Sequence, residues 1–173
     1  MKKWLMAFAI FTSSALAADA EVSKELYSKE TYPEAYCLAL NMYHEARSSN
    51  RADRIAVSDV VLNRVESRHY PDTICEVVYQ AKVRPSWKDP SVMIPVRNMC
   101  QFSWYCDGRD DTPEDQDAWI DAQQIAYMIV ELGQWRGLSE GSTHYHATYV
   151  SPRWANDMQL VGRIGEHIFY RLQ

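Results

Sequence analysis

The spacing of apolar and polar positions predicts a mainly helical chain. Pro33 can occupy the first position of a helix, and the apolar positions after it continue to about Arg47. The polar triplet that follows ends this helix. A second helix, capped by Asn50 or Asp53 and reaching Glu66, has a broad apolar face, which indicates burial on several sides.

The middle of the chain has weaker patterns. A short helix is expected over Thr73–Gln80. The segment 82–112 contains three prolines, two tryptophans and two cysteines without a regular period, which predicts an irregular, disulfide-tied region. Thr112, followed by Pro113 and acidic residues, is the expected N-cap of a helix that reaches Gly133.

Two strands are expected near the C-terminus. Residues 143–150 alternate and are rich in strand-forming residues, and 166–172 are a second candidate. The predicted fold class is therefore α+β: one domain, mainly helical, with a small antiparallel sheet.

Residues 1–17 have the pattern of a secretory signal peptide. Two lysines precede a short apolar core, and Ala15-Leu16-Ala17 fits the cleavage rule, with cleavage after Ala20 as the alternative. The apolar core is too short to span a bilayer. We therefore expect an exported, periplasmic or extracellular protein without stable membrane insertion. Residues 18–32 are expected to form a loose arm, and 33–173 the folded domain.

The charge narrows the choice of partners. The formal net charge is −5, and it becomes −7 once the two leader lysines are removed. This argues against a nucleic-acid partner, whose binding depends on clustered Lys and Arg. We expect a monomer.

Four cysteines follow the leader, and an even number in an exported chain favours disulfides. Cys100 and Cys106 could close a local loop and leave Cys37 for Cys75, or each loop cysteine could pair with one of the earlier two. A four-thiolate zinc site is disfavoured because the chain has no Cys-x-x-Cys pair.

Glu45 is the candidate catalytic residue. It lies on the last turn of the first expected helix, on the same side as Asn41 and Cys37. Apolar neighbours would raise its pKa, and a carboxyl that stays protonated near neutral pH suits acid-catalysed cleavage of a glycosidic bond. The alternative is a solvated glutamate paired with Arg47 or Arg51.

Candidate substrate-binding residues lie between the last two cysteines. A disulfide there would hold Gln101, Phe102 and Trp104 in place. An amide can bond sugar hydroxyl and acetamido groups, and an indole face can pack on the C–H surface of a sugar. The alternative is an ordinary loop with a buried tryptophan.

The strand at Thr143 provides a second group of candidates, His144, Tyr145 and His146. The two histidines project from the same face of the strand. That spacing is compatible with zinc if His44, His167 or an acid completes the site. The favoured alternative is that they bond to the backbone or line a polar cleft, because the chain has no His-Glu-x-x-His motif.

Asn63 interrupts the apolar face of the second helix and is the remaining substrate-binding candidate. Its amide could bond the backbone where the Glu45 helix ends, or it could orient the carboxyl itself. A serine hydrolase is excluded because the Gly-x-Ser-x-Gly motif is absent.

Several segments together match one family in the expected order. They are 37–39, 43–47, 56–65, 70–80, 100–108, 143–147, 150–155 and 163–171. Over Cys37 to Arg171 the chain resembles the cell-wall hydrolases related to spore-cortex-lytic enzymes. It departs from them at Ser48-Ser49-Asn50, where the family usually has glycines, and it has no recognisable wall-binding module.

The resemblance implies a lysozyme-like catalytic domain that cleaves the bond between N-acetylmuramic acid and N-acetylglucosamine in peptidoglycan. The reaction would be lytic transglycosylation or, alternatively, muramidase-type hydrolysis, without a cofactor or metal. The glutamate of the Glu-Ala-Arg motif, here Glu45, would be the acid. Gln101, Tyr145 and His144 would position the N-acetyl group. A zinc amidase or peptidase using His144 and His146 is the less favoured alternative.

Overall fold

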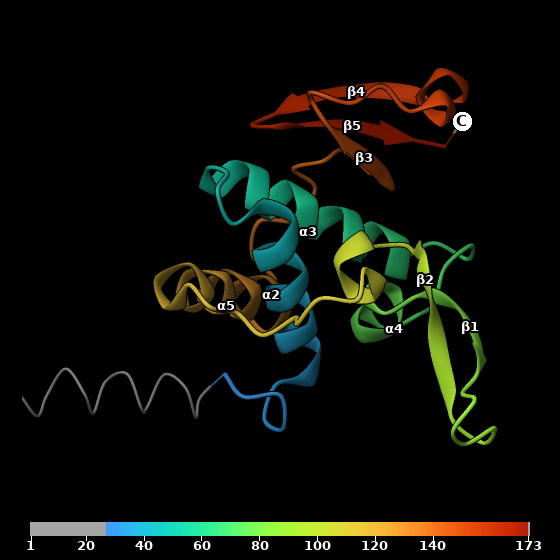
Figure 1. The fold of residues 1–173 in the computed structure, drawn as a ribbon. Helices are drawn as coiled ribbons and strands as arrows, with labels where there is room; N and C mark the ends of the chain where they lie inside the picture. The colour runs from blue at the N-terminus through green and yellow to red at the C-terminus, as the bar shows by residue number, and fades with distance from the viewer. Residues whose placement is uncertain (1–26, 173) are drawn as a thin grey trace, which may run out of the picture.

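The computed structural model describes residues 27–172, so the expected signal peptide and most of the expected arm lie outside the described part. Within that part, helices and two small antiparallel sheets confirm the α+β class (Figure 1). No helix there is long and apolar enough to cross a membrane. The elements in chain order are α2 (Pro33–Ala46), α3 (Arg51–Val65), α4 (Ile74–Val78), β1 (Ala81–Pro85), β2 (Met93–Cys100), the 3₁₀ helix η1 (Ser103–Cys106), α5 (Gln116–Val130), β3 (His144–Ala147), the 3₁₀ helix η2 (Arg153–Asp157), β4 (Gln159–Ile164) and β5 (His167–Arg171).

Helix α2 is the centre of the helical body and packs against α3, α4 and α5. It begins at Pro33, as expected, and most of its residues are buried. A disulfide between Cys37 and Cys75 joins it to α4. The Glu34 carboxylate accepts hydrogen bonds from the backbone N–H groups of Ile74, at 2.6 Å, and Cys75, at 3.2 Å. These bonds satisfy free N–H groups at the start of α4.

Of the two caps expected for α3, Asn50 is the one used: its side chain accepts from the Asp53 N–H at 3.0 Å. Asp53 itself is fully buried and accepts from His167 Nδ1 at 2.9 Å and from the Glu166 N–H at 3.0 Å. Gly165 has φ +56°, and a Cβ there would lie 2.6 Å from the Asp53 carboxylate. The turn between β4 and β5 can therefore approach α3 only with glycine at this position.

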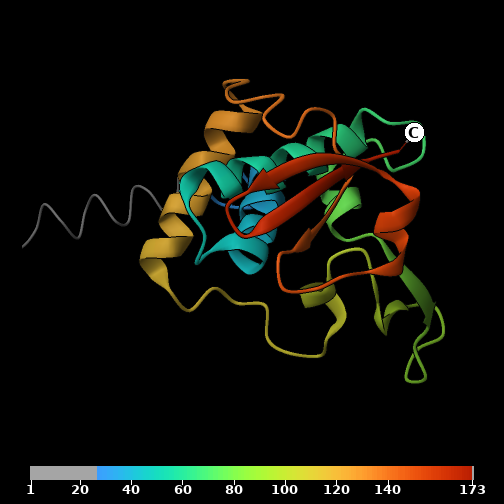
Figure 2. The same ribbon diagram turned by 90° about the horizontal axis from the view of Figure 1, so that it is seen from above.

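The three-stranded sheet, in the order β3-β5-β4, lies across α3 (Figure 2). Both expected strands are confirmed as β3 and β5, and Tyr145 pairs with Phe169 between them. Phe169 is fully buried against α3 residues, which include Val57 and Val60. Strand β4 was not expected, because its register shifts beside Gly162 and most of its residues are partly or fully exposed.

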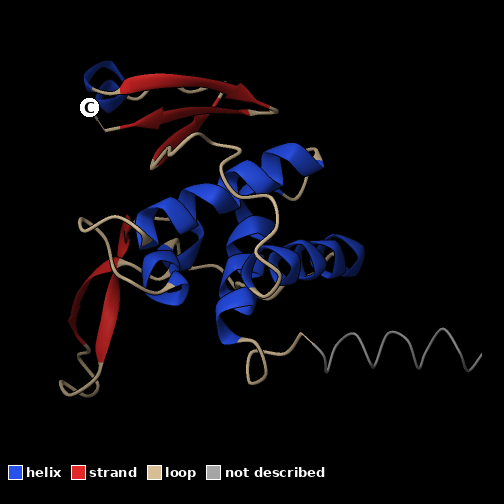
Figure 3. Cartoon of the chain, turned by 180° about the vertical axis from the view of Figure 1, so that it is seen from behind, coloured by secondary structure: helices blue, strands red, loops and turns tan. Residues whose placement is uncertain are grey.

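The expected irregular region is partly wrong, because it contains the β1–β2 hairpin (Figure 3). Pro85 and Pro95 concealed the pattern, since proline disrupts a strand signal. In a two-stranded ribbon the outer edge of each strand is unpaired, and a proline whose nitrogen faces that edge costs no ladder hydrogen bond. The expected disulfide tie is confirmed between Cys100 and Cys106, so the local pairing is the correct alternative.

The start of α5 differs from the expected one by three residues. Asp115, rather than Thr112, caps the helix by accepting from the Ala118 N–H at 3.1 Å. Thr112 is occupied elsewhere: its hydroxyl donates to the Asp110 carboxylate at 2.8 Å. The helix also ends at Val130, before the expected Gly133.

The described end of the expected loose arm, residues 27–32, packs against α5. The rings of Tyr27 and Tyr32 each contact Tyr127 edge-on, with centroids 5.2 Å apart. The Tyr27 carbonyl accepts from the Gln123 side chain at 3.1 Å. For these residues the expectation of a loose segment is therefore wrong.

Candidate active site

Glu45 lies where two pockets meet. It is partly exposed on the last turn of α2. A larger cleft of about 540 Å³ and a smaller pocket of about 180 Å³ are both lined by Glu45 and Ser103. An elongated substrate could therefore pass through both pockets and present an internal bond to this carboxyl.

The end of α2 leaves the Glu45 side chain without an ion pair. Arg54 donates to the carbonyl of Ala46 at 3.3 Å, and its guanidinium also bonds the Arg47 carbonyl and the Asp121 carboxylate. These bonds satisfy carbonyl groups that a helix end leaves free. Arg47 donates instead to the Tyr43 hydroxyl at 3.0 Å. The Arg51 guanidinium lies over the Trp135 ring, 4.8 Å from its centroid. Neither Arg47 nor Arg51 pairs with Glu45, so the solvated ion-pair interpretation does not describe its surroundings.

Burial raises the pKa of the Glu45 carboxyl above its ordinary value. The Tyr145 hydroxyl, which donates to Oε2 at 3.0 Å, acts in the opposite direction, as do the charges of His167 and Arg64. Among residues 27–172, no second carboxylate is one of the groups that act on this pKa. The protonated form of Glu45 therefore persists to higher pH than that of a solvated glutamate.

Arg64 is a functional candidate that the sequence analysis missed. Its side chain lines the smaller pocket with Glu45 but is only 5% exposed. It lies between the rings of Tyr70 and Phe102, at 5.3 and 5.2 Å, and its Nε donates to the Thr143 carbonyl at 2.8 Å. Its buried Nη1 has no hydrogen-bond partner among residues 27–172.

The sequence does contain a signal that could have identified Arg64, namely a cation on the otherwise apolar face of α3. Burial lowers the pKa of its guanidinium, and the nearby Glu45 and Tyr145 raise it. An arginine held in a nearly closed, aromatic surrounding is costly to bury without a charged partner. The structure therefore places a positive charge where it favours the ionised form of Glu45.

The smaller pocket also contains two of the expected substrate-binding residues, Gln101 and Phe102. Gln101 is exposed, and its backbone N–H donates to the Gln80 carbonyl at 2.9 Å, next to the hairpin. Phe102 is only 3% exposed. Gln101 can therefore offer its amide to a ligand, whereas Phe102 forms the base of the pocket under Arg64.

Trp104 does not present an open face to a sugar. The side chain is 7% exposed and stacks on His44, with ring centroids 4.6 Å apart. Its indole N–H donates to the Asn41 side-chain oxygen at 3.0 Å. Trp104 lines the larger cleft, but its contacts support the end of α2, so the expected role as a sugar platform is wrong.

The outer wall of the larger cleft is a loop rich in charged residues. His44 Nε2 donates to the Asp111 carbonyl at 3.1 Å, and the Tyr43 hydroxyl accepts from the N–H groups of Glu114 and Asp115. Both contacts join this loop to α2. The charged residues that line the cleft, besides Glu45 and His44, are Arg47, Asp107, Arg109, Asp110, Asp111 and Glu114.

His144 and His146 project from the same face of β3, as expected, but neither lines the two pockets at Glu45. His146 is fully engaged: Nδ1 donates to the Ala147 carbonyl at 2.9 Å, and Nε2 accepts from the Tyr170 hydroxyl at 3.0 Å. Burial, with a smaller effect from Arg64, lowers the pKa of His144 to about 4. Tyr145 points to the opposite face, toward Glu45.

The expected contacts of Asn63 are also wrong. Its amide donates to the Ser139 hydroxyl at 3.0 Å and to the Ser142 carbonyl at 2.9 Å. It therefore holds the turn before β3 rather than the end of α2. The zinc alternative gains no support from geometry, since residues 27–172 contain no group of three or more His, Cys, Asp or Glu side chains arranged to hold a metal ion.

Comparison with known proteins identifies the class to which this fold and site belong. The family model described as Cell Wall Hydrolase matches residues 48–170, most of the chain. The chain therefore belongs to the cell wall hydrolase family and is an enzyme. Glu45 lies three residues before the matched segment, so its assignment depends on the geometry described above. No curated protein sequence matches the chain significantly.

Two solved structures are similar in fold. One is the catalytic domain of the germination-specific lytic transglycosylase SleB from Bacillus anthracis, with 20% identity and a TM-score of 0.55, covering 80% of this chain and 93% of that one. The other is the catalytic domain of the SleB protein of Bacillus cereus, with 20% identity and a TM-score of 0.52, covering 80% and 89%. At this identity the likeness describes the fold, and it agrees with the expected lysozyme-like architecture.

Proposed function

We propose that this protein is a lytic transglycosylase, which cleaves the bond between N-acetylmuramic acid and N-acetylglucosamine in peptidoglycan with Glu45 as its acid and base. Membership of the cell wall hydrolase family supports wall degradation. The similarity in fold to a germination-specific lytic transglycosylase from Bacillus anthracis supports the reaction type. Because peptidoglycan lies outside the cytoplasm, the proposal includes export of the protein.

One observation carries the assignment of Glu45. It is a partly exposed carboxyl at the meeting point of two pockets, and its pKa is raised by burial. Within the described part of the chain, no second carboxylate is one of the groups acting on that pKa. A retaining glycosidase of the usual kind needs two carboxyl groups about 5 Å apart. A transglycosylase needs only one, because its nucleophile is a hydroxyl of the substrate.

The proposed reaction has two proton transfers, and the Glu45 carboxyl takes part in both. Protonated Glu45 gives its proton to the bridging oxygen as the bond to the anomeric carbon of the muramyl residue breaks. The muramyl 6-hydroxyl attacks that carbon, and ionised Glu45 takes the hydroxyl proton. The products are a 1,6-anhydromuramyl end and a free N-acetylglucosamine hydroxyl, and Glu45 is protonated again.

The smaller pocket would stabilise Glu45 in its ionised form, between the two proton transfers. Tyr145 donates to the Glu45 carboxylate, and Arg64 provides a nearby positive charge, so both favour Glu45 once it has lost its proton. Gln101 is exposed and lines the same pocket, where its amide would bond an N-acetyl group. His144, which faces away from both pockets, is left out of this assignment.

Hydrolysis by water is the second candidate, because four acidic side chains besides Glu45 line the larger cleft and one of them could activate water. Asp111 is the candidate among them, since burial raises the pKa of its carboxyl; the charge of His44 lowers this pKa, and the neighbouring Asp107 and Asp110 raise it further. A raised pKa gives a stronger base than an ordinary carboxylate.

The decisive experiment is digestion of purified sacculi followed by mass spectrometry of the soluble muropeptides. We expect anhydromuramyl products from the parent enzyme and a loss of roughly 10²–10⁴-fold in rate for Glu45→Gln, because proton transfer by a positioned side chain is worth about that much. Glu131→Gln, at the C-terminal end of α5, is the matched control and should keep full activity.

Other products would overturn the proposal in distinguishable ways. Reducing muramic acid ends would show hydrolysis, and free stem peptides would show an amidase. Full activity of a folded Glu45→Gln variant would remove Glu45 from the mechanism, whichever bond is cut.

A further inference from the structure

The β1–β2 hairpin extends away from the helical body and from the three-stranded sheet (Figure 1, Figure 3). Several of its apolar side chains are exposed to solvent. Trp87, in the turn between the strands, is 79% exposed, and Val92 beside it is 49% exposed. Large exposed apolar side chains gathered on one projecting element indicate a surface that something else covers.

One face of the ribbon is apolar where the two strands pair in regular register. Val83 lies opposite Pro95, and Pro85 lies opposite Met93. Directly opposed residues share a face, and so do residues two apart on one strand, so these four side chains are on the same face. Val83 is 48% exposed and Met93 53% exposed. Trp87 follows Pro85 by two residues, in the turn.

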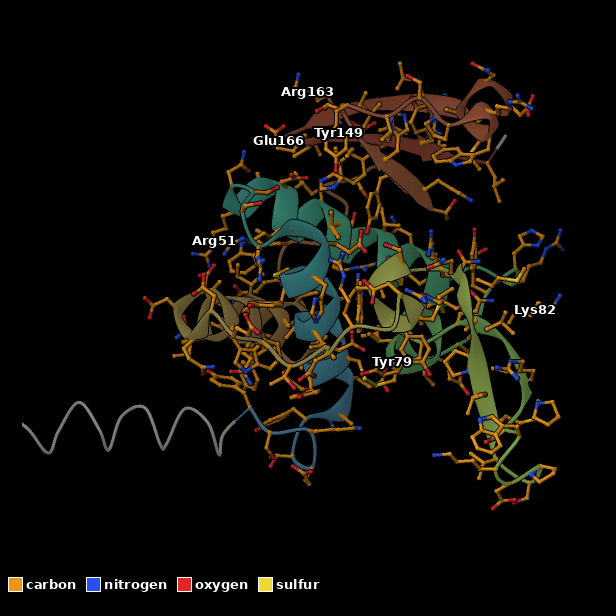
Figure 4. The ribbon with its side chains drawn as sticks, viewed as in Figure 1. Arg51, Tyr79, Lys82, Tyr149, Arg163 and Glu166 are labelled. Carbon is orange, nitrogen blue, oxygen red and sulfur yellow. A yellow bond between two sulfur atoms is a disulfide. The ribbon has the colours of Figure 1, made fainter. Side chains whose placement is uncertain are left out.

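The hairpin is also positively charged, in contrast to the rest of the chain. Residues 81–100 contain four Lys or Arg and one Asp, a net charge of +3, whereas the whole chain is −5, so the other residues sum to −8. Arg97 is engaged with the Asp107 carbonyl at 3.1 Å. Lys82, Arg84 and Lys88 are exposed (Figure 4 labels Lys82). The Lys88 ammonium lies 5.4 Å from the Trp87 ring centroid.

We propose that the β1–β2 hairpin docks on the surface of an anionic lipid bilayer. Tryptophan favours the boundary between headgroups and acyl chains, where its ring is buried and its N–H stays wet. Lys88 is next to Trp87, and the long side chain of Arg84, which starts from the other face of the ribbon opposite Ile94, can also extend its charge to lipid phosphates. Basic residues near an anionic leaflet are attracted to it. The hairpin combines both features on one element.

The aliphatic part of this surface favours lipid over a glycan strand. Valine, proline and methionine side chains offer nothing to bond sugar hydroxyls, but they gain by leaving water. Docking would also place the active site near the membrane, because β2 ends at Cys100, next to Gln101 in the smaller pocket. None of Lys82, Arg84, Trp87 and Lys88 lines either pocket at Glu45, so the proposal stands apart from the glycan chemistry.

The test is co-sedimentation of the full chain with vesicles of pure phosphatidylcholine or of phosphatidylcholine with roughly a third phosphatidylglycerol. The parent should bind the anionic vesicles more strongly, and added salt should weaken binding. A triple variant, Lys82→Gln, Arg84→Gln and Lys88→Gln, should lose roughly tenfold or more in binding. Trp87→Ala should also weaken binding.

The matched control removes three exposed arginines elsewhere, Arg68→Gln, Arg153→Gln and Arg163→Gln, and keeps the hairpin (Figure 4 labels Arg163). It has the same net charge as the triple hairpin variant, so it should bind anionic vesicles like the parent. Because all these chains share the same N-terminal residues, a difference between them reports the hairpin.

Three results would overturn the inference. The first is equal binding of the parent to neutral and anionic vesicles, and the second is unchanged binding by the triple hairpin variant. The third is hairpin variants that lose binding to sacculi, or lose self-association in ultracentrifugation, while they still bind vesicles. Activity of the hairpin variants on dispersed muropeptide chains should stay at the parent level in every case.

Discussion

The two pockets that meet at Glu45 are built in different ways. The smaller one has a buried arginine between two rings, a tyrosine bonded to the carboxyl and a loop closed by a disulfide. The larger one has a wall of mostly exposed charged side chains on the loop after η1. Charges interact far more strongly in a buried surrounding than across water. We therefore expect the smaller pocket to control the proton on Glu45 and the larger one to contribute mainly to substrate binding.

The largest effect should come from removing the buried charge of the smaller pocket. Arg64→Met keeps much of the side-chain length but leaves the Thr143 carbonyl without its bond. We expect a loss of roughly 10²-fold in kcat, comparable to the loss of one preorganised donor in other active sites. The pKa of Glu45 should rise because a positive charge that lowers it is gone. Activity should then decline at higher pH than in the parent.

Arg64→Lys is the matched control, because it keeps the charge and changes the geometry. It should retain the parent pH profile even if the rate falls. Thermal unfolding of both variants separates a folding defect from a catalytic one. A parent-like rate and pH profile for folded Arg64→Met would show that the smaller pocket does not control the proton.

The next prediction concerns the contacts that hold Tyr145 and its strand, β3, in place. The strand that carries it is paired with β5, and β5 is joined to α3 through the buried contact of His167 with Asp53. Asp53→Asn should cost about 3 kcal/mol in the free energy of unfolding, since breaking one side of a buried charged contact is strongly destabilising. Asp121→Asn, a partly exposed partner of Arg54, is the control and should cost about 1 kcal/mol or less.

The pKa of Asp53 also predicts how its contribution to stability changes with pH. Burial opposes the ionised form of Asp53, but hydrogen bonds from His167 and the Glu166 N–H outweigh it and hold the pKa below its ordinary value. The group therefore stabilises the fold above its unfolded pKa, and this contribution is lost as the pH falls through the lower folded pKa. Chemical unfolding of Asp53→Asn should show less loss of stability in acid than the parent. An equal acid dependence would contradict it.

The sequence predicted the helix that carries Glu45 better than it predicted the surroundings of that residue. The apolar period and Pro33 act within a few residues, so α2 and the position of Glu45 on its last turn followed directly. Arg64 gains its role from Tyr70, Phe102 and Thr143, which are brought to it by packing, and no local pattern records such contacts. For the same reason, the sequence did not predict the contacts of Trp104 with His44 and Asn41.

Strand alternation was similarly informative only in part. It predicted that His144 and His146 project from the same face of the strand, and they do. It could not predict which face of the sheet packs on α3. In the structure, the face that carries Tyr145 and Phe169 does so. The two histidines therefore turned away from Glu45, and the tyrosine between them became the contact.

A smaller effect is expected from removing the Tyr145 hydroxyl. Tyr145→Phe deletes a charge-assisted bond to Glu45, and such bonds are worth about 1.5–3 kcal/mol. We expect roughly a tenfold loss in rate. The pKa of Glu45 should rise, because this bond lowers it, so the alkaline decline of activity should move to higher pH. Tyr149→Phe, at an exposed tyrosine labelled in Figure 4, should change neither.

The smallest effect should come from the larger pocket, and it decides between the two reaction types. Asp111→Asn removes the candidate carboxylate for activating water but keeps the backbone carbonyl that holds His44. If the substrate hydroxyl is the nucleophile, this carboxylate has no proton to accept, and kcat should change by less than about threefold while the products stay anhydromuramyl. If water is the nucleophile, the rate should fall by roughly 10²-fold or more, because a general base contributes that much. A large loss would therefore move the chemistry to both pockets and replace a one-acid mechanism with a two-carboxylate one.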